Sequence, residues 1–276
     1  MNEESLMRSR IRKILMICSN YDAFALEEDG RIENQVKNEY RELNLSNPPK
    51  FIWANSSAQA RDIIGSEEDI DMIICMYNEQ DKEIFPFASR LKDEGRGIPF
   101  ILLIHYSKAV RQRVLESPHP GVDFVFSWHG NADLILAIVK LLEDAANAEN
   151  DVFEVGVKGI LLVEDSIRYY SNYLPELYKI VLTQSREFLT ESLNDDQKKY
   201  RKRSRPKIFL ATCLEEAIAY FEKYRRNLLG VISDVGMVFH KGDDPKTEKL
   251  DAGIDLVRII REYDPLMPVL LQSSQG

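Results

Sequence analysis

The sequence alternates short apolar stretches with amphipathic helical stretches, and it passes through this alternation twice in 276 residues. In the first pass, five apolar stretches of strand length are each followed by residues with helical spacing. Such alternation favours a parallel sheet with helices on both faces, because each crossover needs a long connection. The expected strands lie at residues 13–19, 50–55, 71–76, 99–105 and 122–127, and the expected helices at residues 30–43, 57–64, 82–92, 108–115 and 131–144.

The second pass begins after an acidic stretch of small residues, EDAANAENDVFEVGV, which has no clear periodicity. We interpret part of this stretch as a linker, which gives a first domain of residues 1–146, a linker of residues 147–157 and a second domain of residues 158–276. Each domain is long enough to own a core. In the second pass, strands are expected at residues 158–163, 207–211, 229–233 and 268–272, and helices from about residue 167, at 214–225 and at 254–262.

The second pass stops after its fourth strand, so its sheet would keep an apolar strand at the edge. We therefore expect a fragment of a longer polypeptide, with pairing to a second copy as the alternative. The helical stretch after Ser166 is expected to run past thirty residues, and its extension at residues 187–203 is a candidate partner-binding helix or hairpin.

Composition narrows the classes of function. The chain is 44% hydrophobic, which suits a packed core, and its formal charge of −9 disfavours binding to nucleic acid. Three cysteines lie in apolar stretches at no metal-ligand spacing, as expected of buried thiols in the cytoplasm. The sequence has neither a targeting segment nor a stretch of transmembrane length, so we expect a cytoplasmic protein with no membrane partner.

Acidic residues finish two strands of the second pass. Glu164 and Asp165 follow the first strand, and Asp234 follows the third, which should lie beside the first. Ligands of open α/β sheets bind at the carboxyl ends of the strands, so the three carboxylates are expected to converge there. Oxygen ligands suit Mg²⁺, which would also relieve the repulsion between the carboxylates. Ser273 follows the fourth strand and offers a hydroxyl to a neighbouring phosphoryl oxygen.

Four motifs of this half, ILLVEDS, GVISDVGM, AGIDLVRIIRE and MPVLLQSS, resemble the receiver domains of bacterial response regulators across residues 158–276. The resemblance implies two flavodoxin-like, doubly wound domains, the second truncated after its fourth strand. It implies that Asp234 accepts a phosphoryl group from a histidine kinase or a phosphotransfer protein, that Glu164 and Asp165 bind Mg²⁺, and that the backbone carbonyl of Gly236 is a further ligand. Ser273 would be the switch hydroxyl. No residue is predicted to be catalytic, and the chain is not expected to be an enzyme.

The second half also departs from the receiver pattern. Receivers carry a phosphate-binding lysine on a fifth strand, and the sequence ends before such a strand. A long polar loop, VFHKGDDPKTEKLDA, replaces the usual short turn after the acceptor. Asp243 and Asp244 in this loop could approach the metal, although an exposed polar loop is the favoured interpretation.

The first half fits the same template without its chemistry. Where receivers have acids, the first strand is followed by Cys18, Ser19 and Asn20, and Met76 stands at the acceptor position. Ile104 replaces the switch hydroxyl and Trp128 the lysine, while Asp22 is the lone nearby acid. These substitutions indicate a pseudoreceiver that serves in interaction or dimerisation, so a homodimer is possible.

Two other interpretations stay open. The two halves could form a scaffold for protein–protein interaction in which Asp234 is never phosphorylated. Alternatively, VEDSIRYYSNYLPELYK and NLLGVISDV are similar to receiver-like segments that precede pyruvate-phosphate-dikinase or phosphoenolpyruvate-synthase type domains. The chain would then be the regulatory part of such an enzyme.

Overall fold

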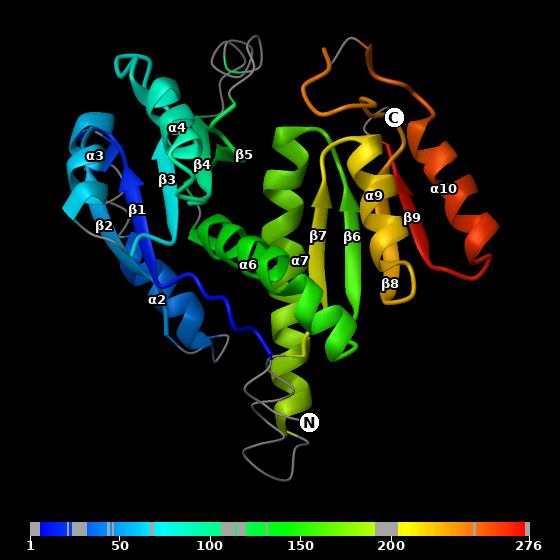
Figure 1. The fold of residues 1–276 in the computed structure, drawn as a ribbon. Helices are drawn as coiled ribbons and strands as arrows, with labels where there is room; N and C mark the ends of the chain where they lie inside the picture. Colours follow the sequence, from blue (N-terminus) through cyan, green and yellow to red (C-terminus); the bar gives the residue numbers. More distant parts are fainter. Residues whose placement is uncertain are drawn as a thin grey trace. The chain divides into compact units, whose positions relative to one another are not determined.

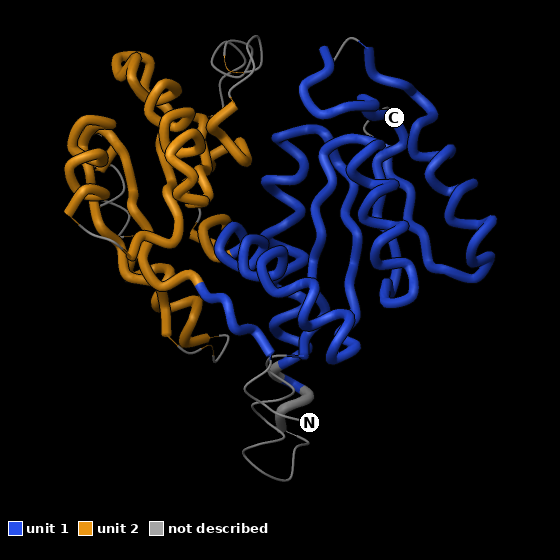
Figure 2. Tube along the Cα trace, in the orientation of Figure 1, with its two compact units in different colours: residues 1–10, 137–276 blue, residues 11–136 orange. Residues whose placement is uncertain are grey.

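The computed structural model describes residues 6–20, 22–23, 32–42, 45, 47–66, 69–105, 114, 120–130, 132–190, 204–244 and 247–273. The chain divides into two compact units, which Figure 2 shows in different colours. One consists of residues 11–136 and is called the N-terminal unit. The other, called the C-terminal unit, combines residues 1–10 with residues 137–276.

The N-terminal unit contains a five-stranded sheet in the order β2-β1-β3-β4-β5, in which every pairing is parallel. This is the flavodoxin-like strand order, so this half fits the expected parallel-sheet α/β fold. The strands are β1 (Lys13–Ile17), β2 (Lys50–Ala54), β3 (Met72–Met76), β4 (Phe100–His105) and β5 (Phe124–Trp128). The described helices are α2 (Ile32–Glu42), α3 (Ser57–Ser66) and α4 (Ile84–Asp93), while most of the helix expected at residues 108–115 lies outside the described residues.

Burial follows position in this sheet. Every residue of the central strand β3 is buried, as expected of a strand covered by helices on both faces. The edge strand β2 instead has Lys50 and Trp53 exposed while Phe51 and Ala54 are buried. The central strand is therefore more completely buried than the edge strand.

The C-terminal unit contains four parallel strands in the order β7-β6-β8-β9 among its described residues (Figure 1). Both units are thus parallel-sheet α/β structures, and this order equals the first four positions of the flavodoxin-like arrangement. The strands are β6 (Gly159–Val163), β7 (Lys207–Ala211), β8 (Leu228–Asp234) and β9 (Val269–Gln272). The helices that follow β6, β7 and β8 are α7 (Ile167–Thr190), α9 (Leu214–Tyr224) and α10 (Ala252–Tyr263).

The core of this unit joins the sheet to α9 and α10. Phe209 and Val231 of the sheet pack in one cluster with Phe221 of α9 and with Leu256 and Ile260 of α10. The apolar residues of both helices recur at helical spacing, and this is why each helix presents one apolar stripe to the sheet. The edge that carries the acidic residues is therefore supported by a closely packed layer.

The structure differs from the expected domain division. Residues 147–157 were expected to be a linker, but α6 (Ala132–Ala148) continues into a π-helical segment, η2 (Glu149–Glu154). Asp151 and Val152 are buried in the C-terminal unit, so one acid of this stretch serves an interior contact, while Glu149 and Glu154 are exposed. Because residues 6–10 also belong to this unit, the N-terminal unit is inserted between two parts of the C-terminal unit.

The long helix after Ser166 is present as α7, with 24 residues and Pro175 inside it. Most of the extension expected at residues 187–203 lies outside the described residues. Among the helices that the structure describes, none is both long enough and apolar enough to cross a membrane.

Gly253, in the first turn of α10, touches the backbone that carries Asp234. A Cβ atom at residue 253 would collide with the Asp234 carbonyl oxygen and lie 3.0 Å from the Cα of Val235. We predict that Gly253→Ala lowers the free energy of unfolding by about 1–3 kcal/mol, because backbone atoms must move apart.

Gly65→Ala is the matched control for this prediction, since nothing lies within 4 Å of a Cβ at that position in α3. Alanine is the better helix former there, so the control should be neutral or stabilising by up to about 1 kcal/mol. Urea unfolding followed by circular dichroism measures both variants. Equal stabilities of the two variants would contradict the close contact at Gly253.

Candidate functional site

The three predicted acidic ligands lie together at the carboxyl edge of the second sheet. Glu164 and Asp165 directly follow β6, and Asp234 is the last residue of β8. These strands pair in parallel with Val163 opposite Ser233, so their ends emerge side by side. One carboxylate oxygen from each of the three acids lies within 4.8 Å of the others. The sequence-based expectation that these acids meet is therefore met by the geometry.

Hydrogen bonds orient the Glu164 side chain, which is only 1% exposed. Its Oε1 accepts a hydrogen bond from the Ser166 N–H at 3.1 Å, and its Oε2 accepts one from the Gln272 side-chain amide at 3.2 Å. Sequence reasoning missed Gln272 because it considered the next residue, Ser273, as the polar group of β9. The strand register explains the contact, since Gln272 pairs with Asp234.

The loop after β8 holds the other two carboxylates. The N–H of Val238 donates to Asp165 Oδ2 at 3.2 Å, and the N–H of Val235 donates to Asp234 Oδ1 at 2.7 Å. The same loop is fixed to the start of α9, because the Val238 carbonyl accepts a hydrogen bond from the Leu214 N–H. Main-chain donors thus set the direction of the acids without neutralising their charge.

Burial raises the pKa of all three acids, and repulsion by neighbouring charges adds to this effect at Glu164 and Asp165. Burial, with the nearby charges of Asp234 and Asp165, raises the pKa of Glu164 to about 8. Burial, with the charges of Glu248 and Asp234, raises the pKa of Asp165 to about 6. Burial also raises the pKa of Asp234. A cluster of carboxylates with raised pKa values at a sheet edge is typical of a functional site, because a bound cation would stabilise the ionised forms.

Glu248 is a fourth acid at this edge, and the sequence did not single it out. An antiparallel bridge between Met237 and Lys249 brings the far end of the long loop back to β8. The Glu248 side chain then lies against Gly236, where a Cβ atom would collide with Glu248 Oε1. Glu248 is exposed to solvent, and its negative charge lies beside the site.

Asp243 and Asp244 are not members of the three-carboxylate group. Asp243 Oδ2 accepts a hydrogen bond from the His240 N–H at 2.9 Å within the loop tip, and Asp244 is exposed. The favoured interpretation of an exposed polar loop therefore fits Asp244, while Asp243 is half-buried. Glu248 is brought to the site by the bridge between Met237 and Lys249, which are twelve positions apart. No local sequence pattern predicts this bridge.

The other predicted site residues lie on the same edge. Gly236 is buried two residues beyond Asp234, and Ser273 directly follows β9 and is exposed. Tyr173 of α7 is a further neighbour that the sequence did not indicate. Burial and the charges of Glu164 and Asp234 raise its pKa, and its ring stacks on that of Tyr169 with 6.0 Å between the centroids.

The corresponding edge of the N-terminal unit has different chemistry. Met76 ends β3 and is 2% exposed, and burial, with the nearby charge of Asp22, raises the pKa of Cys18 to about 12. Asp22 accepts a hydrogen bond from Ser19 Oγ at 2.7 Å and lies 3.4 Å from His105 Nε2. Among the described residues of this unit, no group of three potential metal ligands converges.

Comparison with known proteins adds little to this geometry. No family model matches the chain, and no curated protein matches it. Among solved structures, the chain is similar to a "probable two-component system response regulator/GGDEF domain protein", with 17% identity over 96% of this chain and 84% of that chain and a TM-score of 0.34. It is also similar to GanP, a glucose-galactose binding protein from Geobacillus stearothermophilus, with 12% identity over 96% of this chain and 78% of that chain and a TM-score of 0.26. Similarities this low assign no function, so the function is inferred from the residues of this chain.

The raised pKa of Glu164 predicts how stability depends on pH without divalent cations. The ordinary pKa of the side chain is 4.5 and its folded value is about 8. Between these values the folded state binds more protons than the unfolded chain, so the free energy of unfolding falls as the pH rises through this window. We expect the melting temperature of the wild type to fall between pH 5 and pH 8.

Glu164→Gln removes this ionisation and should make the pH dependence shallower. Glu149→Gln, at an exposed acid of η2, is the control and should keep the wild-type slope. Thermal unfolding in a chelating buffer measures all three proteins. Identical slopes for Glu164→Gln and the wild type would contradict the raised pKa.

Proposed function

We propose that the C-terminal unit is a receiver-type phosphoacceptor domain and that the N-terminal unit is a pseudoreceiver. The supporting observation is the convergence of Glu164, Asp165 and Asp234 at the carboxyl edge of a flavodoxin-like sheet. Ligand sites of such folds lie at this edge. Asp234 is the acceptor, and its phosphoryl donor is a histidine kinase or a phosphotransfer protein.

The residues present suit Mg²⁺. All three side chains offer carboxylate oxygens, which magnesium prefers. Magnesium binds oxygen at about 2.1 Å, so ligands on opposite sides of the ion lie about 4.2 Å apart. The three carboxylate oxygens, which lie within 4.8 Å of one another, are therefore close enough to share one ion. Bound Mg²⁺ would neutralise the acids and reduce their repulsion of a phosphoryl group.

The transfer itself requires little of the protein beyond position. A carboxylate oxygen of Asp234 attacks the phosphorus of the phosphohistidine; a P–O bond forms, the P–N bond breaks, and its electron pair returns to the imidazole of the donor. The N–H of Val235 orients the attacking carboxylate. Glu164, Asp165 and Asp234 would hold the metal together with the Gly236 carbonyl, and Ser273 is the hydroxyl that would bond the new phosphoryl group.

A second candidate function is a scaffold in which Asp234 is not phosphorylated. Glu248 favours it, because its carboxylate lies beside Gly236 and adds negative charge near Asp165, which would repel a phosphoryl group. The substitutions in the N-terminal unit, with Met76 buried at the acceptor position, suit a scaffold equally well. Homodimerisation and a role in regulating a phosphoenolpyruvate-synthase-like enzyme stay predictions from the sequence.

Binding of Mg²⁺ and beryllofluoride, a phosphoryl mimic, tests the proposal. We expect the wild type to bind both, and Asp234→Asn to lose beryllofluoride binding and to bind Mg²⁺ roughly tenfold more weakly, because one charged ligand is gone. Asp22→Asn is the control at the equivalent edge of the N-terminal unit and should bind as the wild type does. Calorimetry is the measurement, since both tryptophans, Trp53 and Trp128, lie in the N-terminal unit. Failure of the folded wild type to bind either ligand would favour the scaffold.

Glu248→Gln separates the two candidate functions further. If repulsion by Glu248 slows phosphoryl transfer, removal of its charge should raise the rate of phosphorylation by a small-molecule phosphodonor several-fold to about tenfold. Mass spectrometry of Asp234 measures the rate, and Asp243→Asn in the same loop is the matched control. An unchanged rate in Glu248→Gln would remove the observation that favours the scaffold.

A further inference from the structure

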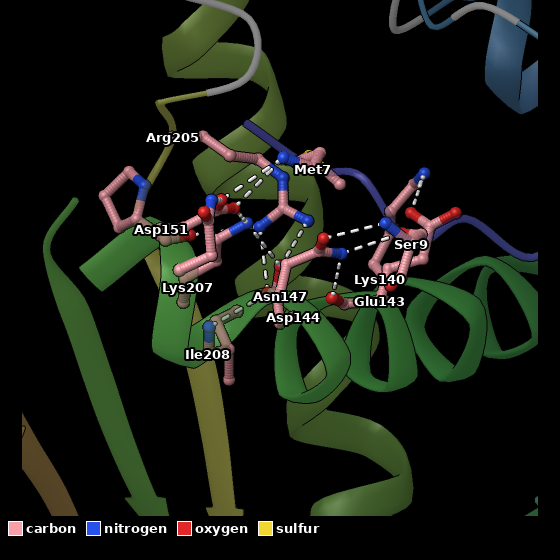
Figure 3. A network of polar contacts seen from close by, with 12 residues as sticks. Met7, Ser9, Lys140, Glu143, Asp144, Asn147, Asp151, Arg205, Lys207 and Ile208 are labelled. Carbon is pink, nitrogen blue, oxygen red and sulfur yellow. Dashed lines mark hydrogen bonds and ion pairs between the residues drawn. The ribbon is translucent and has the colours of Figure 1, made fainter. Parts of the chain in front are cut away.

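A second group of charges lies in the C-terminal unit, at the amino end of β7 (Figure 3). We call it the polar lock, and its residues are Asp144, Asn147, Asp151, Arg205 and Lys207. Each of these residues is at most 3% exposed. Such burial requires that the charges be paired, because an unpaired ion loses its hydration without compensation.

The charges of the polar lock balance. The Arg205 guanidinium donates two hydrogen bonds to Asp144 at 2.8 and 2.9 Å, and Tyr178 of α7 donates a third at 2.9 Å. Lys207 Nζ lies 2.7 Å from Asp151 Oδ2 as an ion pair, off the direction of a hydrogen bond. Although burial acts to raise it, the pKa of Asp144 is held below its ordinary value by Arg205 and Lys207. Two acids and two bases thus form a neutral interior group.

Residues 6–10, which we call the strap, bind to this group through their main chain. Asn147 Oδ1 accepts a hydrogen bond from the Ser9 N–H at 2.9 Å, and Asn147 Nδ2 donates to the Ser9 carbonyl at 2.7 Å. Both oxygens of Asp151 accept from the Met7 N–H, at 3.2 and 3.4 Å. Asn147 therefore pairs with the backbone of the strap as a neighbouring strand would, and these hydrogen bonds do not involve the side chain of residue 9.

Two further observations indicate that the strap is held rather than merely adjacent. Leu6 is 2% exposed, so the strap also has an apolar anchor. Met7 has a φ of 48°, a conformation that residues other than glycine adopt rarely and that surrounding contacts must maintain. The hydrogen bonds from the Met7 N–H to Asp151 are among these contacts.

The position of the strap in the chain gives it a consequence. It lies directly before β1 of the N-terminal unit, and α6, which carries Asp144 and Asn147, directly follows β5 of that unit. Both chain connections between the units, at residues 10–11 and 136–137, therefore lead into the same lock. We propose that the strap is an intramolecular ligand of the rest of the C-terminal unit, recognised through its backbone by Asn147 and Asp151.

A pair of substitutions at Ser9 tests this proposal in the full chain. Ser9→Pro removes the N–H that Asn147 accepts, whereas Ser9→Ala keeps the main chain and removes only the hydroxyl. We expect the Met7 amide to exchange with solvent roughly tenfold faster in Ser9→Pro, because loss of the hydrogen bond opens the strap. In Ser9→Ala the rate should stay at the wild-type value. Asn147→Ala, on the other side of the contact, should behave as Ser9→Pro does.

Hydrogen exchange followed by mass spectrometry measures these rates, and tryptic cleavage after Arg10 is an independent readout that the proline does not block. Circular dichroism verifies that each variant is folded. Exchange of the wild-type Met7 amide at the rate of an unstructured peptide would overturn the proposal, and so would equal exchange in Ser9→Pro and Ser9→Ala. Protection that grows with protein concentration would also overturn it, since the strap would then bind a second copy of the chain.

Discussion

The parallel pairing of β6 with β8 is the constraint on which the candidate site depends. Because the two strands run in one direction with Val163 beside Ser233, the acids that follow them emerge at the same edge. The close contact of Gly253 with the Asp234 backbone fixes α10 against that edge. Hydrogen bonds from the loop after β8 to Asp165 and Asp234 then complete the arrangement. The position of the candidate site is thus a consequence of strand order.

Folding brings like charges together at this edge at a cost in stability. Burial disfavours the ionised form of Glu164, and the hydrogen bonds from Ser166 and Gln272 offset only part of that effect. Apolar burial in the core that joins Phe209 and Phe221 to α10 offsets this cost. A site that is unfavourable when empty of cations and supported by a packed layer is suited to bind a cation.

The same unit contains a second charged group with the opposite character. At the amino end of β7, the charges of Asp144 and Asp151 are matched by those of Arg205 and Lys207, so the group is neutral and closed to solvent. At the carboxyl end, Glu164, Asp165 and Asp234 have no basic partner within their group. Balanced charge suits an assembly contact, and unbalanced charge suits a ligand site. The two ends of one sheet therefore differ in charge balance.

The sequence by itself determined the strands, their parallel arrangement and the meeting of Glu164, Asp165 and Asp234, because all of these follow from local periodicity and from the rule that parallel strands end at one edge. It also marked Met76 as unable to serve as an acceptor. Only the tertiary structure decided the places of Gln272 and Glu248, the helical path through Asp151 and the binding of Met7 to the C-terminal unit. These depend on contacts between residues distant in the chain, such as Met7 and Asp151, which are 144 positions apart. No local pattern of side chains encodes which distant partner a buried acid will find.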